Sequence, residues 1–175
     1  GFNYGIFSLY ALYNSASKIY GFEPNIDIYN TIKNIYPEKD KVEILNCAVS
    51  DENKKIIFYS TEDTLSSSIT PAKNKQSKEY EVQCINLYDF IIENNIEKID
   101  FLKIDCEGEE YKIFESIPDS FFSKIRKILV EFHFNDGYKV NILIDKLNSC
   151  DFKWQFSNNT NHLSDIGLIL AKNNK

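Results

Sequence analysis

The stretch that most constrains the fold of this chain is Ile99–Glu110, in which a short apolar run ends in a group of acids around a glycine. The run from Phe101 to Ile104 has the length and composition of a strand buried on both faces of a sheet. A parallel sheet offers its ligands the carboxyl ends of its strands, and Asp105 and Glu107 fall at such an end. We therefore predict that these two acids belong to a functional site.

The other residues of this turn have simpler interpretations. Gly108 allows the chain to pass close to a ligand. Glu109 and Glu110 fall in the first turn of the next helix, where negative charge suits the helix dipole, and we expect both to be solvated caps. A solvated cap is also the alternative for Asp105 and Glu107, but acids that close a buried strand favour a functional interpretation.

Composition excludes several classes of protein. With 175 residues, 43% of them hydrophobic, the chain can form one domain with a real core. A net charge of -6 argues against nucleic acid as a partner. The four cysteines include no CxxC pair, so no zinc site is signalled, and together with the lack of a signal peptide they indicate a reduced, cytoplasmic protein. No apolar run approaches the roughly 20 residues of a membrane helix.

The chain begins with a glycine loop, Gly1-Phe2-Asn3-Tyr4-Gly5, followed by a helix over residues 6–14. This helix is apolar nearly all round, which predicts that it is buried on more than one side. A glycine loop that feeds a buried helix normally follows a strand. We therefore expect the chain to be truncated at its N-terminus, with the first strand of the sheet missing.

A short strand over residues 18–22 ends in Glu23-Pro24-Asn25. An acid at the end of the second strand of a nucleotide-binding unit can accept hydrogen bonds from two ribose hydroxyls, and it lies about 20 residues after the glycine loop, as Glu23 does. A helix cap or a surface acid is the alternative. Pro24 stops the strand, and Asn25 can cap a helix over residues 26–35.

Strand and helix alternate through most of the remaining chain, which predicts a mostly parallel sheet with helices on both faces. The expected strands cover residues 42–48 (running on into 49–51), 56–60, 80–85, 125–134, 152–156 and 166–171, and the expected helices cover 87–94 (capped by Asn86), 111–117 and 138–148. Strands 56–60 and 80–85 are predicted to add an antiparallel pair at the sheet edge, and the last two strands to form a hairpin. The polar segment 61–78 is either a functional flap or a mobile connection.

The glycine loop, Glu23 and the Cys47-Ala48 turn together describe a cleft for an adenosine. Either a dinucleotide or S-adenosylmethionine could bind there. The loop lacks the GxGxxG pattern that cradles a pyrophosphate, which favours the methyl donor over NAD.

Four blocks carry a family resemblance: residues 1–8 (GFNYGIFS), 22–25 (FEPN), 45–51 (LNCAVSD) and 100–110 (DFLKIDCEGEE). In order and spacing they resemble the signature blocks of the FkbM family of S-adenosylmethionine-dependent methyltransferases. The resemblance implies a Rossmann-like class I methyltransferase fold, a three-layer sandwich whose last strand is antiparallel. It also implies methyl transfer to a hydroxyl oxygen, on a small natural product or on a sugar of a bacterial surface glycan.

The resemblance also implies roles for individual residues. Cofactor contacts are expected from Gly1, Asn3 and Gly5 around the methionine part of the donor, from Glu23 and Pro24 around the ribose, and from Asn46, Cys47 and Ala48 around the adenine. Asp105 and Glu107 would lie beside the reacting methyl group. The carboxyl ends of neighbouring strands are predicted to gather Gly5, Glu23, Ala48 and Asp105 around one crevice.

Methyl transfer to a hydroxyl needs positioning and removal of a proton. The candidate bases are Asp105, Glu107 and His133, which alternates with Glu131 onto one face of the strand over residues 125–134. Two carboxylates and a His could instead hold a divalent metal, but no denser ligand set supports one, and no metal is predicted. His162 lies in a polar stretch and is expected to be exposed.

Two other functions stay open. One is a nicotinamide-dependent oxidoreductase on a similar sheet, against which the missing pyrophosphate pattern counts. The other is a degenerate or non-catalytic nucleotide-binding domain. A glycosyltransferase is a weaker possibility, because the acids form no DxD pattern. The sequence identifies neither the acceptor nor the oligomeric state.

Overall fold

The computed structural model describes residues 1–36, 40–61, 77–133, 140–158 and 166–174. The chain forms two compact units, one of Gly1–Ala48 with Asn53–Cys84 and one of Val49–Glu52 with Ile85–Lys175. The single domain stays a prediction. Residues 62–76 of the predicted polar connection, and His162, lie outside the described residues. Within those residues, every helix is too short or too polar to span a bilayer.

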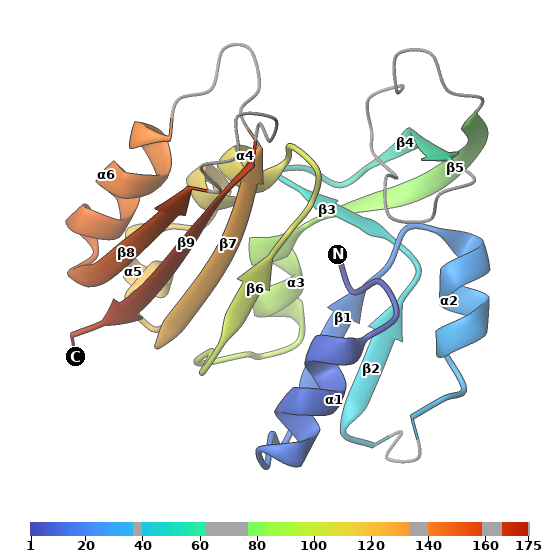
Figure 1. Cartoon of the computed structure of the whole chain (residues 1–175), viewed down its shortest axis with the longest axis horizontal. Helices are drawn as coiled ribbons and strands as arrows, with labels where there is room; N and C mark the ends of the chain where they lie inside the picture. The colour runs from blue at the N-terminus through green and yellow to red at the C-terminus, as the bar shows by residue number, and fades with distance from the viewer. Residues whose placement is uncertain (37–39, 62–76, 134–139, 159–165, 175) are drawn as a thin grey trace. The chain divides into compact units, whose positions relative to one another are not determined.

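The first unit contains a parallel strand pair with a helical connection. Its first elements are α1 (Ile6–Tyr13), β1 (Ile19–Phe22), α2 (Ile26–Ile32) and β2 (Val42–Leu45). Strands β1 and β2 run parallel, with Phe22 opposite Leu45, so their carboxyl ends meet at one edge (Figure 1). Asn25 caps α2 as predicted, because its side-chain oxygen accepts hydrogen bonds from the backbone N–H groups of Asp27 and Ile28.

A three-stranded sheet follows, in the order β3-β5-β4. Its members are β3 (Ala48–Ser50), β4 (Lys54–Thr61) and β5 (Ser77–Asn86). Strands β4 and β5 pair antiparallel as predicted, but they form a sheet with β3 instead of the predicted addition to the edge of the parallel sheet. The single strand predicted over residues 42–48 is wrong, since β2 and β3 are separate strands in different sheets. The break falls at Asn46, whose side chain donates to the carbonyl groups of Glu23 and Pro24 and so turns the chain toward the end of β1.

Helix α1 is far more exposed than its sequence predicts. Ile6 is 78% exposed and Tyr13 89%, and the helix buries only Ser8. The prediction of burial on more than one side is therefore wrong for the described residues. The apolar character of a helix shows that burial of its side chains would be favourable. Burial requires another segment to pack against the helix, and the sequence of the helix does not specify that segment.

The second unit is built on a four-stranded sheet in the order β6-β7-β9-β8. Its elements are α3 (Leu87–Glu93), β6 (Leu102–Ile104), α4 (Glu110–Ser116), α5 (Asp119–Phe122), β7 (Lys127–His133), α6 (Asn141–Ser149), β8 (Phe152–Asn158) and β9 (Ile166–Asn173). Strands β6 and β7 are parallel, and β9 runs antiparallel to both β7 and β8. The antiparallel final strand and the terminal hairpin are thus confirmed.

One face of this sheet is packed against helices and forms the core. Alternate residues of β7, namely Ile128, Val130 and Phe132, are fully buried. Helices α4 and α5 lie behind the strands in Figure 1, and α4 contributes Phe114, whose ring packs edge-on against Phe122 of α5. The period-2 burial of β7 follows from the alternation of side chains across a strand.

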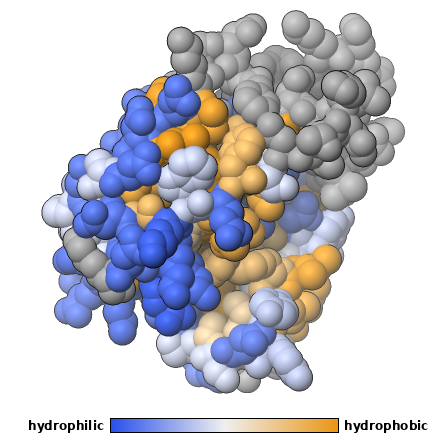
Figure 2. All heavy atoms as spheres, turned by 60° about the vertical axis from the view of Figure 1, so that its left-hand side comes forward, coloured by the Kyte–Doolittle hydropathy of each residue, from blue (hydrophilic) through white to orange (hydrophobic). Residues whose placement is uncertain are grey.

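The opposite face of the sheet is more open. Here β7 presents Glu131 and His133, both partly buried, while β9 presents Leu168 and Leu170, which are 37% and 46% exposed. Figure 2 shows hydrophobic side chains reaching the surface between hydrophilic ones. Since Ile104 pairs with Val130, Asp105 falls opposite Glu131, which brings the charged residues at the carboxyl ends of β6 and β7 onto the same side.

Candidate functional site

The first unit holds a buried carboxylate at the end of β1. Glu23 is 5% exposed. Its Oε2 accepts a hydrogen bond from the backbone N–H of Asn3 at 2.7 Å, and its Oε1 accepts one from the N–H of Asn25 at 2.9 Å. The carboxylate therefore connects the glycine loop to the start of α2, two of the segments that sequence analysis assigned to the donor.

Burial raises the pKa of Glu23, and the two backbone N–H groups oppose that rise by stabilising the charged form. Each carboxylate oxygen has two lone pairs and uses one of them for a backbone N–H. Acceptor capacity therefore remains for hydroxyl donors, which is the chemistry that the ribose role requires.

The glycine loop is held close to this carboxylate. The N–H of Phe2 donates to the carbonyl of Phe22 at 3.0 Å, and the hydroxyl of Tyr36 donates to the carbonyl of Gly5 at 2.7 Å. Gly5 has φ +71°, and a Cβ added there would lie 1.8 Å from the Tyr36 oxygen. Only glycine fits this position, whereas Gly1 is exposed.

The predicted adenine-side residues play different parts in the first unit. Asn46 uses its side-chain amide to hold the Glu23-Pro24 backbone, at 2.8 Å and 3.1 Å. Cys47 is 5% exposed, and burial raises the pKa of its thiol to about 12, so it stays protonated. Ala48 packs with the β4–β5 pair in a small core cluster. The structure thus brings Asn46 beside Glu23, while the side chains of Cys47 and Ala48 are buried.

The second unit gathers charged groups at the ends of β6 and β7. Asp105 forms an ion pair of 2.7 Å with Lys103, and both side chains are 27% exposed. Burial would raise the pKa of Asp105, but the Lys103 ammonium and the nearby His133 hold it below its usual value. Burial and the charge of Asp105 raise the pKa of Glu131 on the neighbouring strand.

Glu107 and His133 are in direct contact. The Nε2 of His133 lies 3.2 Å from Oε2 of Glu107. Glu107 occupies the left-handed region with φ +52°, which is uncommon for a residue with a side chain and is typical of tight functional turns. Its side chain is 37% exposed against 15% for His133, so Glu107 is the member of the pair that an incoming molecule can reach.

Glu110 was missed as a site residue. Its side chain is wholly buried, and its carboxylate accepts hydrogen bonds from the backbone N–H groups of Cys106 and Gly108 at 3.0–3.1 Å. Its Oε1 also lies 3.2 Å from Nδ1 of His133. The expectation of a solvated cap is therefore wrong for Glu110. It is also wrong for Glu109, whose side chain is 12% exposed and contacts Lys112 and Ser50.

A signal for Glu110 exists in the sequence, although it is weak. Glu110 directly precedes Tyr111 and lies three and four residues before Ile113 and Phe114, so it falls on the side of α4 that those apolar residues bury. Dipole arguments favour an acid at this helix start without saying whether it faces water. The residue that compensates the charge of Glu110 is His133, which lies 23 positions away in the sequence.

His133 is held between two carboxylates. Its hydrogen bonds with Glu107 and Glu110 raise its pKa to about 10, against the opposing effect of burial. The ring therefore carries a proton at neutral pH and donates from both nitrogens. An imidazolium can hold and orient carboxylates, whereas it has no free lone pair with which to accept a proton.

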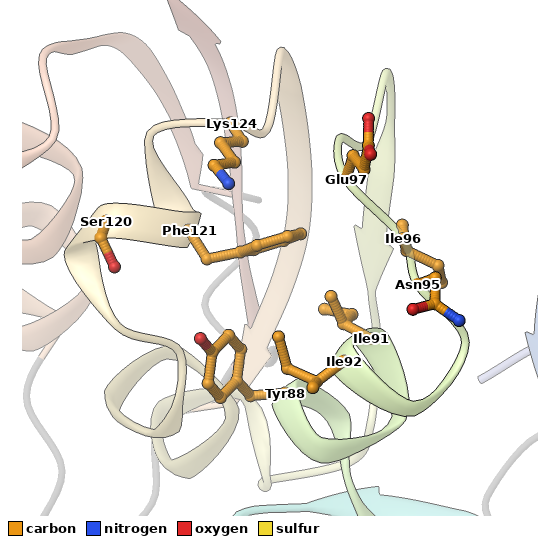
Figure 3. Close-up of a pocket in the computed structure, with 9 residues that line it drawn as sticks. All are labelled: Tyr88, Ile91, Ile92, Asn95, Ile96, Glu97, Ser120, Phe121 and Lys124. Atoms are coloured by element: carbon orange, nitrogen blue, oxygen red, sulfur yellow. The ribbon is translucent and has the colours of Figure 1, made fainter.

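A hollow of about 410 Å³ lies elsewhere in the second unit (Figure 3). It is lined by Tyr88, Ile91, Ile92, Asn95, Ile96, Glu97, Ser120, Phe121 and Lys124. Glu97 precedes β6 and Lys124 precedes β7, so the hollow lies at the amino ends of these strands, opposite the end that carries the acids. None of the predicted site residues lines it.

Comparisons with known proteins agree on one family. Residues 1–154 match the model of the methyltransferase FkbM domain. The chain is 27% identical to the 31-O-demethyl-FK506 methyltransferase FkbM of Streptomyces tacrolimicus, over 78% of this chain and 65% of that protein. It also resembles the crystal structure of methyltransferase FkbM from Methylobacillus flagellatus KT, with a TM-score of 0.57 and 15% identity over 97% of this chain and 41% of the other. The chain thus spans less than two thirds of the length of these proteins.

Proposed function

Because the chain belongs to the methyltransferase FkbM family, we propose that it transfers a methyl group from S-adenosylmethionine to a hydroxyl oxygen of a sugar, a glycan or a small natural product. The fold is the Rossmann-like methyltransferase fold of that family. The observation that carries the proposal is the hydrogen bond from Asn3 to Glu23, which joins the glycine loop to the strand-end acid in the first unit.

The donor would be held by the residues gathered around that contact. Glu23 would accept hydrogen bonds from the ribose hydroxyls, and the backbone of Gly1, Asn3 and Gly5 would lie along the methionine part. Pro24, Asn46, Cys47 and Ala48 would border the ribose and the adenine, the last two through their backbone because their side chains are buried. The bound donor supplies a methyl group on a sulfonium, which is already a good leaving group.

The second unit would supply the chemistry at the acceptor. Asp105, Glu107 and His133 are the candidate proton acceptors at the carboxyl ends of β6 and β7. His133 carries a proton at neutral pH, and Asp105 and Glu107 are each paired with a cation, so Glu107 is preferred as the more exposed carboxylate, at 37% against 27% for Asp105. The surplus of acids over bases here disfavours an anionic acceptor and suits a neutral polyol or alcohol.

The name of one relative supports a hydroxyl acceptor. The Streptomyces tacrolimicus protein is named for methylating an oxygen of 31-O-demethyl-FK506. A sugar or natural-product acceptor for this chain follows by analogy with the family. We also propose a reducing, cytoplasmic location, since none of the four cysteines, Cys47, Cys84, Cys106 and Cys150, forms a disulfide.

Calorimetry with purified protein tests the donor. S-adenosylmethionine should bind and NAD should not, and S-adenosylhomocysteine should compete as the product. Transfer itself is tested by incubating the protein with labelled donor and a panel of neutral alcohols and sugars, with mass spectrometry of the products. Binding of NAD in preference to S-adenosylmethionine would overturn the proposal.

A further inference from the structure

Glu110 is in a costly position that none of the donor or acceptor roles explains. Its side chain has no exposure to water, and burying a carboxylate is strongly unfavourable unless hydrogen bonds and an opposite charge compensate it. The compensation comes from three directions, the N–H groups of Cys106 and Gly108 and the ring of His133. These partners of the carboxylate lie in the 106–108 turn and at the end of β7. Glu110 is therefore placed to fix the position of that turn relative to His133.

The turn that Glu110 organises includes Glu107. Cys106 and Gly108 flank Glu107, and both donate to the same carboxylate. Glu107 has φ +52°, a conformation that is uncommon for a residue with a side chain and persists only where the surroundings hold it, whereas the next residue, Gly108, adopts φ +111° without steric cost. The two N–H contacts from either side supply that hold.

The ring of His133 connects the two acids. Its Nδ1 lies 3.2 Å from Oε1 of Glu110 and its Nε2 lies 3.2 Å from Oε2 of Glu107. Exposure rises along the series, from 0% for Glu110 through 15% for His133 to 37% for Glu107. The series therefore runs from a buried anchor to an accessible carboxylate.

We propose that Glu110 is a positioning residue, which fixes the Glu107 carboxylate through the His133 ring and through the 106–108 turn so that Glu107 receives the proton of the acceptor hydroxyl. This inference rests on the proposed methyl transfer. In that step the acceptor oxygen forms a bond to the methyl carbon, the carbon–sulfur bond breaks with its electron pair going to sulfur, and the hydroxyl proton passes to Glu107.

The charged groups around His133 agree with a holding role. Lys103 on β6 and Asp105, directly after that strand, form their own ion pair, and Glu131 on β7 is close enough for the charges of Asp105 and His133 to act on it. The hydroxyl of Tyr111 donates to the backbone carbonyl of His133 at 3.1 Å and fixes the end of the strand. The imidazolium thus faces a majority of acids, and each of its nitrogens is assigned to a separate carboxylate.

Nuclear magnetic resonance of the histidine rings tests the inference without any acceptor. The sequence has two histidines, and His162→Gln identifies the second resonance. In the wild-type protein both nitrogens of His133 should stay protonated up to about pH 10. Glu110→Gln, which keeps the shape but removes the charge, should lower that pKa by at least one unit. Glu115→Gln is the matched control, an exposed acid on the same helix, and should leave it unchanged.

Kinetics supply the second readout. With a working acceptor, Glu110→Gln should lower kcat at least 10-fold while the Kd of S-adenosylmethionine stays within 2-fold, and Glu115→Gln should change neither. If Glu110→Gln does not fold, Glu107→Gln replaces it in the resonance experiment, because the exposed partner can be neutralised without disturbing the core.

The outcomes separate the two proposals. A wild-type His133 that titrates near 6.5, or one that ignores both substitutions, would overturn the positioning role even if the protein methylates its acceptor. A His133 that behaves as expected in a protein that binds no S-adenosylmethionine would instead support the contacts of His133 with Glu107 and Glu110 and overturn the proposed function. Full activity in Glu110→Gln would also overturn the positioning role.

Discussion

The backbone N–H of Asn3 donates to Oε2 of Glu23 at 2.7 Å, across 20 residues of sequence. This contact joins the glycine loop to the acid at the end of β1, the two features on which donor binding was predicted. Glu23 is buried, so its carboxylate is shielded from water. The backbone N–H groups of Asn3 and Asn25 hold the carboxylate in one place.

Replacing Glu23 by Ala should weaken binding of S-adenosylmethionine at least 10-fold, about 1.4 kcal/mol, because the ribose hydroxyls would lose a charged acceptor. Isothermal calorimetry measures the change. Glu43→Ala on β2 is the control, since that acid is 46% exposed and forms only a surface ion pair with Lys18. Equal affinities for the two variants would remove Glu23 from the donor site.

Gly5→Ala should destabilise the protein by more than the roughly 1–3 kcal/mol of backbone strain at φ +71°, since the added Cβ would also meet the Tyr36 hydroxyl. Urea unfolding followed by circular dichroism measures the loss. Gly1→Ala, at the exposed end of the same loop, should leave the midpoint unchanged. A Gly5→Ala protein as stable as the wild type would show that the loop adopts another conformation.

The contribution of His133 to stability should depend on pH. Its pKa is raised from about 6.5 to about 10 in the folded protein, so the stabilisation is fully present below pH 6.5 and is lost as pH rises through 10. The difference in free energy of unfolding between the wild type and His133→Gln should therefore shrink between pH 6.5 and 10.5. If the difference in free energy of unfolding does not change with pH, His133 is not protonated in the folded protein in the way proposed.

Asp105→Asn should lower kcat at least 10-fold with little change in the Kd of the donor, because the predicted role of Asp105 is on the acceptor side. Asp100→Asn is the control, an acid of the same stretch that is 71% exposed and pairs with Arg126. The measurement is steady-state kinetics together with calorimetry on each variant. A loss of donor affinity equal to the loss of kcat would place Asp105 on the donor side instead.

Local features of the fold were predictable because the residues that determine them are neighbours in the chain. Asn25 and Asn86 cap α2 and α3 through N–H groups two and three positions away, and both caps were predicted. The alternation of β7 likewise follows from a short window of sequence. The prediction that the run from Phe101 to Ile104 is buried on both faces is wrong, since Phe101 is 37% exposed and only Ile104 of β6 is buried. The break between β2 and β3 escaped prediction because it depends on Asn46 reaching the Glu23-Pro24 turn.

From the sequence alone, the family, the class of fold and the acids at the strand ends could be predicted, because motif spacing and side-chain periodicity are properties of contiguous residues. Only the tertiary structure decided that Glu110 is buried, that His133 lies between two carboxylates, and that α1 is largely exposed. Burial and ionisation depend on which distant segments pack together, and Glu110 and His133 are 23 positions apart. The charge of His133 therefore follows from packing rather than from its own neighbours in the chain.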